Sequence, residues 1–151
     1  MHQYAAPGDR QWRELTLELP PYPDPARLRG GELVITGAQL TYQLDVDSIR
    51  VDADEVVRYA IVITSSTGAR NVFYEGIRCQ TAEYKSYAYG SQGKWSAAVY
   101  PRWQSIGQIG SSSHRRELFL YYFCNEYHRP VTRDQVLARL INPYRIEGGR
   151  P

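Results

Sequence analysis

Two cysteines, Cys79 and Cys124, constrain the fold of this chain more than any other residues, because each ends a different kind of aromatic segment. Cys79 ends residues 69–79, whose β-branched and aromatic residues predict a β-strand. Cys124 ends residues 118–124, an almost wholly apolar run that predicts a buried helix. A disulfide between them would join the sheet to the helix and indicate an oxidising compartment. Two free buried thiols are the alternative.

The first two thirds of the chain consist of short strand patterns separated by turns. Residues 56–64 give the strongest pattern, since large apolar residues from Val57 to Ile63 occupy every second position. The proline-rich residues 20–25 cannot form a central strand, so we expect them to cross the surface in extended form. Together the patterns predict an antiparallel meander of about six or seven strands. The other segments with a strand pattern, from which this meander would form, are residues 12–19, 33–35, 41–46, 48–51, 69–79, 83–89 and 94–97.

The character of the sequence changes after an aperiodic stretch, residues 99–112, which we expect to be a long loop carrying Trp103. Residues 114–127 are apolar nearly all round and predict a buried helix, capped by Ser113. A second helix is predicted to start at Thr132, which has a glutamine three residues later as in a capping box. A proline follows each predicted helix and ends it.

The fold class predicted from this order is α+β, an antiparallel sheet with two C-terminal helices packed on it. A chain of 151 residues suits one domain with a real core. We place this single domain at residues 11–145. Residues 1–10 are predicted to be a disordered lead-in, and residues 146–151 a tail.

Charge and hydropathy argue against several classes of protein. The net charge is only +2 and basic and acidic residues alternate, so the strong basic field of a nucleic-acid or membrane-surface binder is missing. No apolar stretch is long enough for a transmembrane helix. The first eight residues also lack the pattern of a signal peptide. Two explanations fit: the protein is cytoplasmic with free thiols, or it is exported and its leader was removed from this chain. We expect the second. The removed leader could have carried a lipid anchor.

The sequence gives little support for a metal site. Two free cysteines need two further ligands to hold zinc. His114 and His128 lie at opposite ends of one predicted helix, about 20 Å apart at the helical rise, and cannot supply them together. The carboxylates of residues 45–47 and 52–55 lack the spacing of a calcium loop. We expect no metal and no cofactor.

Catalysis is also weakly supported. No Gly-x-Ser-x-Gly motif is present, and a disulfide would consume both cysteines. The serines before His114, residues 111–113, are more typical of a loop and helix cap than of a nucleophile and its base. We therefore predict that the protein is not an enzyme, with a hydrolase that uses His114 as an alternative.

One group of residues predicts a binding surface. Tyrosines alternate with arginine or lysine on adjacent strands, an arrangement that can stack a ring and hold an anionic group. The same residues could equally pack the strands, with Glu75 and Glu83 neutralising the bases. The candidate binding residues are Arg70, Arg78, Tyr84, Lys85, Tyr87, Tyr89, Trp95, Arg102 and Trp103.

Several stretches, read together, resemble the cryptic neisserial protein-like family of uncharacterised proteobacterial envelope proteins. They are residues 54–59 (Asp-Glu-Val-Val-Arg-Tyr), 66–72 (Ser-Thr-Gly-Ala-Arg-Asn-Val), 74–79 (Tyr-Glu-Gly-Ile-Arg-Cys), 83–90, 19–23 and 122–124, with Trp95 and Trp103. The resemblance spans about residues 12 to 124. It implies an envelope address and a Cys79–Cys124 disulfide, and it brings no activity, cofactor or catalytic residue. Members of the family usually carry an export signal or lipoprotein leader, which this chain lacks.

We therefore expect an exported, periplasmic or envelope-associated protein that is a non-catalytic binding or interaction module. The expected partner is an envelope glycan or another protein, and not a nucleic acid. A domain that binds single-stranded nucleic acid is the first alternative, and the His114 hydrolase is the second. If Cys79 and Cys124 are free, the protein belongs in the cytoplasm.

Overall fold

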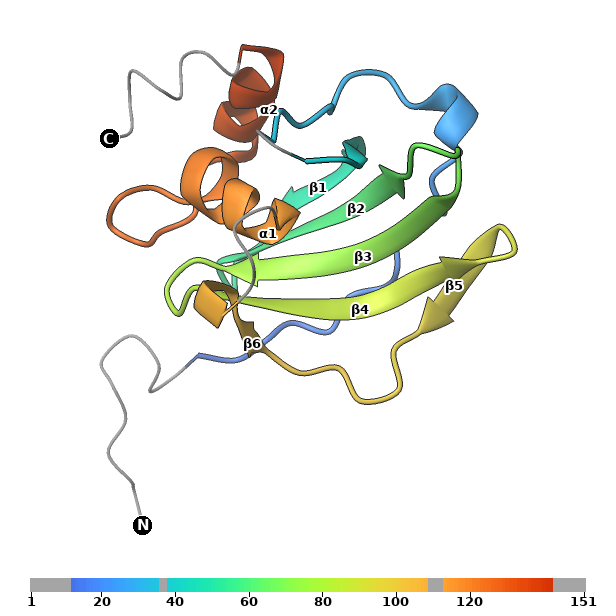
Figure 1. The fold of residues 1–151 in the computed structure, drawn as a ribbon. Coiled ribbons are helices and arrows are strands. Elements are labelled where there is room, and N and C mark those ends of the chain that lie inside the picture. The colour runs from blue at the N-terminus through green and yellow to red at the C-terminus, as the bar shows by residue number, and fades with distance from the viewer. Residues whose placement is uncertain (1–11, 36–37, 109–112, 143–151) are drawn as a thin grey trace.

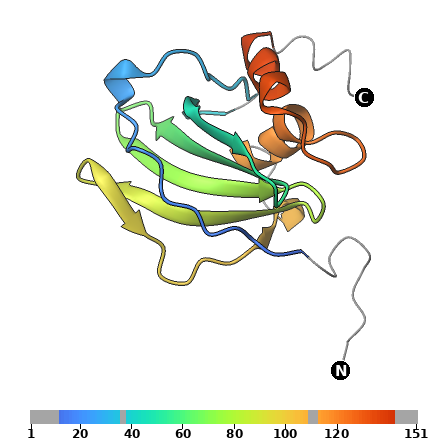
Figure 2. The ribbon, with the colours of Figure 1, turned by 180° about the vertical axis from the view of Figure 1, so that it is seen from behind.

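A computed structural model of the protein describes residues 12–35, 38–108 and 113–142. An antiparallel sheet lies at its centre, with helices on one face (Figure 1) and the extended N-terminal segment on the other (Figure 2). We call these the helix face and the outer face. The elements in chain order are η1 (Pro25–Arg27), β1 (Thr41–Val51), β2 (Val56–Thr64), β3 (Arg70–Arg78), β4 (Glu83–Ser91), β5 (Lys94–Ala97), β6 (Gln104–Ser105), η2 (Ile106–Gln108), α1 (His114–Glu117), η3 (Leu118–Phe123) and α2 (Arg133–Ile141).

The sheet has the strand order β1-β2-β3-β4-β5, all antiparallel, and β6 pairs with the start of β4. The α+β class and the meander followed by two helical segments are thus confirmed. Two bulges interrupt the ladders. In β4, Ala88 pairs with Tyr74 and Ser86 pairs with Glu75, so Tyr87 is an extra residue between two paired ones. The other bulge joins the two strands predicted at 41–46 and 48–51 into the single strand β1.

The main core fills the space between the helix face and the helices. The alternating residues of β2 point into it, because successive side chains of a strand face opposite sides. Val57, Tyr59 and Ile61 are completely buried there. A smaller apolar cluster lies on the outer face, made by Ala60, Tyr74 and Ala88 with Tyr87 and Trp95 packed beside it.

The first predicted helix differs from the observed one in its length. Ser113 caps α1 as expected, since its side chain accepts a hydrogen bond from the backbone of Arg115. After one turn the helix widens into a π-helix, η3, and ends at Phe123 instead of Tyr127. It ends there because Cys124 is extended and forms an isolated bridge with Pro130.

The second helix, α2, begins as predicted. The Thr132 side chain accepts a hydrogen bond from the backbone of Gln135, and the Gln135 side chain accepts one from the backbone of Thr132. This reciprocal pair is the capping box that the sequence indicated. No helix among the described residues has the length and apolar character that crossing a membrane requires.

A disulfide joins Cys79 to Cys124, so the expected pairing is confirmed. Cys79 directly follows β3 and Cys124 directly follows η3, and both are completely buried. The bond therefore fastens the end of a central strand to the end of the helical layer, across 45 residues of sequence.

The strand predicted at residues 12–19 is wrong. This segment is extended, but it crosses the outer face of the sheet without forming a ladder with any strand (Figure 2). The alternating leucines do not mark a buried side, because Leu15 and Leu19 stay 41% and 40% exposed. The strand predicted at 33–35 is reduced to one bridge, between Glu32 and Gln43 of β1, flanked by a hydrogen bond from Leu33 to Tyr42. The predicted lead-in, residues 1–10, and tail, residues 146–151, lie outside the described residues.

The other connecting segments are more ordered than expected. The proline-rich residues 20–25 lead into a short turn of helix, η1, which begins at Pro25 and is capped by the side chain of Asp24. The long loop predicted at 99–112 contains the two-residue strand β6 and the helical turn η2.

Candidate functional site

The outer face is covered by residues 12–22, which we call the strap. Trp12 anchors its first part: the indole nitrogen donates to the backbone carbonyl of Asp54 at 2.7 Å. The Trp12 ring lies 3.7 Å from the guanidinium carbon of Arg78 and meets Trp103 edge-on. The next anchor is the backbone of Leu15, which donates to the Asp54 carboxylate at 2.9 Å. The first part of the strap is therefore bonded to Asp54, in the turn between β1 and β2, and not to a neighbouring strand.

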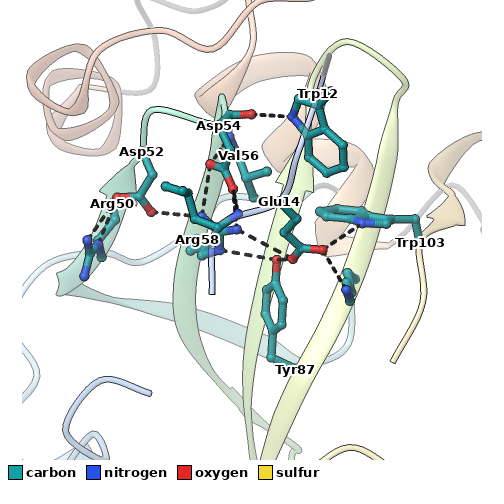
Figure 3. Close-up of polar contacts among 11 residues, drawn as sticks. Trp12, Glu14, Arg50, Asp52, Asp54, Val56, Arg58, Tyr87 and Trp103 are labelled. Carbon is teal, nitrogen blue, oxygen red and sulfur yellow. Dashed lines mark hydrogen bonds and ion pairs between the residues drawn. The ribbon is translucent and has the colours of Figure 1, made fainter. Parts of the chain in front are cut away.

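Glu14 points from the strap toward the sheet and is surrounded by donors (Figure 3). One carboxylate oxygen accepts from Lys85 Nζ at 2.7 Å and from the indole nitrogen of Trp103 at 3.3 Å. The other accepts from the Tyr87 hydroxyl at 2.6 Å and lies 3.6 Å from the guanidinium of Arg58. We call these four residues the carboxylate cradle. No member of the cradle belongs to the strap.

The electrostatics of the cradle keep Glu14 ionised. Burial alone would raise the pKa of Glu14, but hydrogen bonds from Lys85 and Tyr87 and the charge of Lys85 outweigh it and lower that pKa. For Tyr87, burial and the hydrogen bond to Glu14 both raise the pKa of the phenol. Its hydroxyl is therefore protonated at neutral pH and donates to the carboxylate.

Arg58 is the buried charge beneath this arrangement, with only 1% of its surface exposed. Its guanidinium donates to both oxygens of Asp54, at 2.7 and 3.2 Å, and to Asp52 at 3.0 Å. Its Nε donates to the Tyr87 hydroxyl at 3.3 Å. Burial would raise the pKa of Asp54, but the hydrogen bonds and charge of Arg58 lower it. The two aspartates thus hold Arg58 charged and fixed in one orientation (Figure 3).

Two glycines of the outer face allow close packing on it. A Cβ at Gly76 would lie 3.0 Å from ring atoms of Tyr87, so its absence lets that ring lie across β3. A Cβ at Gly90 would collide with Tyr22, which packs edge-on against Trp95. The indole nitrogen of Trp95 also donates to the carbonyl of Pro20 at 2.8 Å, which anchors the far end of the strap.

A cavity of about 230 Å³ lies between the strap and the outer face. Its floor carries charged and hydroxyl groups from the sheet, and three leucines of the strap, which we call its rim, line the other side. Two leucines of the rim, Leu15 and Leu19, are 41% and 40% exposed. The residues that line it are Glu14, Leu15, Thr16, Leu17, Leu19, Arg58, Tyr74, Lys85 and Tyr87. An apolar rim with a few convergent polar groups is typical of a small-molecule site.

A second buried charge lies on the helix face, where Glu75 of β3 is completely buried. It accepts hydrogen bonds from the Tyr59 hydroxyl at 2.7 Å and from Ser86 at 3.0 Å, and it is paired with the His114 ring at 2.9 Å. Arg115 donates to both of its oxygens. Glu75 therefore ties β2 and β4 to the start of α1.

The hydrolase alternative concerns His114 in this cluster, and its predicted serines, Ser111 and Ser112, lie outside the described residues. His114 is buried, 5% exposed, and its ring packs on Tyr42. A catalytic serine would have to bond to the imidazole. Of the described serines near His114, Ser86 donates to Glu75 and Ser113 accepts from the backbone of Arg115.

Glu75 predicts a pH dependence of stability. Burial alone would raise its pKa, but His114 and Arg115 outweigh it and lower the pKa from an ordinary 4.5 to about 2. Because the folded pKa is below the unfolded one, this contribution is complete above about pH 4.5 and is lost as the pH falls to about 2. We expect it to amount to about 3 kcal/mol.

Urea unfolding at a series of pH values checks this prediction. The difference in unfolding free energy between wild type and Glu75→Gln should shrink as the pH falls through that interval. Glu126→Gln, at an exposed position, is the control and should show no such trend. A constant difference for Glu75→Gln would contradict the prediction.

The structure brings together only some of the candidate binding residues. Lys85, Tyr87 and Trp103 meet at Glu14, with Arg78 beside them under Trp12. Trp95 is farther along the strap. The remaining four do not join this site: Tyr84 packs on the helix face under Arg115, Arg70 is exposed where β3 begins, and Tyr89 and Arg102 are exposed.

Several residues of the site were not among the candidates, and Glu14, Arg58 and Asp54 matter most to it. Arg58 carries a signal that could have found it, because it is the one charged residue in the apolar strand β2. A charge within a strand buried on both faces needs a partner. Glu14 carries no such signal, because its partner Lys85 is 71 residues away in the sequence. Residues 12–35, 38–108 and 113–142 contain no group of three or more His, Cys, Asp or Glu side chains that could hold a metal ion.

Comparison with known proteins gives one family and one curated relative. A family model, that of the CNP1-like family, matches residues 8–141, which include the strap, the sheet and the helices. Cryptic neisserial protein 1 of Neisseria gonorrhoeae (strain ATCC 700825 / FA 1090) is 28% identical over 131 residues, 76% of this chain and 64% of the relative. The chain thus spans less than two thirds of that relative's length. No solved structure matches the chain.

Proposed function

The chain belongs to the CNP1-like family, and we propose that it is a non-catalytic binding domain that acts outside the cytoplasm and holds a small ligand in the cavity under the strap. The observation that carries the proposal is the cavity itself. Its floor consists of side chains on a rigid sheet, and its roof is a segment without ladder bonds to that sheet.

The geometry suits a binding site because the floor is fixed in advance. Arg58 is fixed by two aspartates, and Tyr87 rests on Gly76. Groups held in this way lose little freedom when a ligand binds. At about 230 Å³, the cavity has room for several waters or one small organic molecule.

The disulfide supports the location. Disulfides persist in oxidising compartments and are rare in the cytosol. The Cys79–Cys124 bond is completely buried and joins two layers of the fold, which is typical of a structural bond rather than a regulatory one.

The same geometry does not favour the nucleic-acid alternative. Stacking of bases requires open aromatic rings beside free cations. Here the strap covers the aromatic cluster of the outer face, and its Glu14 pairs with Lys85. Arg58 is paired with two aspartates.

Blocking the cavity tests the proposal. We expect at least one compound from a set of single sugars, amino acids and short carboxylates to raise the thermal midpoint of the wild-type protein. Leu19→Trp puts a larger ring on the rim of the cavity and should abolish that shift. Val34→Trp, at a 63% exposed position that does not line the cavity, is the matched control and should keep it. A set that shifts none of the proteins, or all three alike, would contradict the proposal.

A further inference from the structure

We propose that the ligand of the cavity carries a carboxylate, and that this carboxylate takes the place of Glu14 in the carboxylate cradle. The inference rests on the proposed function, because it names the chemical class of the ligand for that same site. In the structure the strap supplies the carboxylate, and Glu14 shows where the corresponding group of a ligand would bind.

The first argument is the origin of the donors. Lys85 and Tyr87 are two residues apart on β4, and Arg58 projects from the same face of β2. Trp103 comes from the segment before β6. None of these residues belongs to the strap, so the donors remain on the rest of the domain when Glu14 leaves, although Trp103 also meets Trp12 of the strap edge-on.

The second argument is that the cradle is complementary to a group with two acceptor oxygens. Lys85 and Trp103 donate to one oxygen, and Tyr87 donates to the other. If Glu14 leaves, the Lys85 ammonium, the Tyr87 phenol and the Trp103 indole lose their acceptor. Leaving partly buried donors without a hydrogen-bond acceptor costs free energy. A carboxylate on the ligand would satisfy all three, whereas a neutral or cationic ligand would leave Lys85 without a counter-charge once Glu14 had moved.

The third argument is the position of the cavity. Glu14, Lys85 and Tyr87 belong to its lining, so the body of a ligand in the cavity lies directly beside the cradle. Leu15, Leu17 and Leu19 would contact that body. The class that fits both parts is a small organic carboxylate with a partly apolar body.

Exchange with Glu14 also regulates binding. Glu14 is tethered and therefore competes with a free carboxylate at high effective concentration. The apparent affinity of wild type for a carboxylate is reduced in proportion to the fraction of molecules with an empty cradle. Removing Glu14 should remove this competition, and a bound carboxylate should release the strap around Glu14.

Sodium propionate is the probe, and propionamide, of the same shape but uncharged, is its control. Binding is measured by NMR titration of wild type, Glu14→Ala and Glu14→Ala with Lys85→Met. We expect Glu14→Ala to bind propionate at least about ten-fold more tightly than wild type does. The affinity for propionamide should show no such gain. Adding Lys85→Met to Glu14→Ala should abolish the gain in affinity for propionate. If Glu14→Ala does not fold, Glu14→Gln keeps the size of the side chain without its charge, and a tighter affinity than that of wild type is still expected.

The outcomes separate the inference from the proposed function. Equal affinity of wild type and the Glu14 variants for propionate, or equal gains for propionate and propionamide, would overturn the carboxylate assignment. Suppose that a neutral sugar or amino acid binds wild type, that Leu19→Trp abolishes this binding and that Glu14→Ala leaves it unchanged. This result would overturn the carboxylate assignment and would support the cavity as a ligand site. The double variant Glu14→Ala with Leu19→Trp tests the cavity itself. If this variant still binds propionate as Glu14→Ala does, the cavity is not the site of the ligand.

Discussion

Replacing both Cys79 and Cys124 by alanine is expected to lower the free energy of unfolding by about 4 kcal/mol. The bond closes a loop across 45 residues, and its loss gives the unfolded chain more conformations. Both sulfurs are completely buried among apolar residues, so alanine introduces no polar group into the core. Equilibrium urea unfolding of the variant and of the oxidised wild type at neutral pH measures the difference.

The single variant Cys124→Ala is the control for this experiment. It also removes the bond and should lose nearly as much stability as the double variant. A loss below about 1 kcal/mol in the double variant would contradict the prediction. In the native organism the same bond tests the proposed location: rapid alkylation of denatured cells should find neither thiol free unless a reductant is added first. Free thiols would place the protein in the cytoplasm.

Replacing Arg58 by methionine is expected to lower the free energy of unfolding by about 3–5 kcal/mol, because it removes one partner of a buried ion pair. Asp54, only 6% exposed, would lose both bonds to the guanidinium, and Asp52 would lose one. Methionine keeps an unbranched chain of similar length, so the loss reports mainly the uncompensated carboxylates. Urea unfolding at neutral pH measures it.

Arg50→Met is the matched control. Arg50 also pairs with Asp52, at 3.0 Å, but its side chain is 51% exposed. Solvent screens such a pair, and we expect a change within about 0.5 kcal/mol. Similar losses for the two variants would mean that the buried pairing of Arg58 contributes no more than the exposed pair.

The sheet and the helices could be predicted because their signals are local. Every second residue of β2 points to the helix side of the sheet. This alternation can be seen in the sequence of β2 alone, without knowledge of the partner strands. The capping box of α2 lies within four residues. What could not be predicted is how an alternating segment bonds its backbone. Residues 12–19 have the pattern of a strand, yet their partners are side chains such as Asp54.

The candidate site was predicted in part for the same reason. Lys85 and Tyr87 share a face because they are two apart on one strand, whereas the adjacent Tyr84 must point to the other face. The strand pattern therefore already separates them. Glu14 completes the site from 71 residues away, and no local pattern links it to β4.

The two layers that cover the sheet differ in how firmly they are attached. A covalent bond fastens the helical layer, whereas the strap stays in place through side-chain contacts at its two ends. One side of the sheet can therefore become accessible while the other side keeps its shape. A molecule built in this way can take up and release an occupant by local opening, with most of its architecture unchanged.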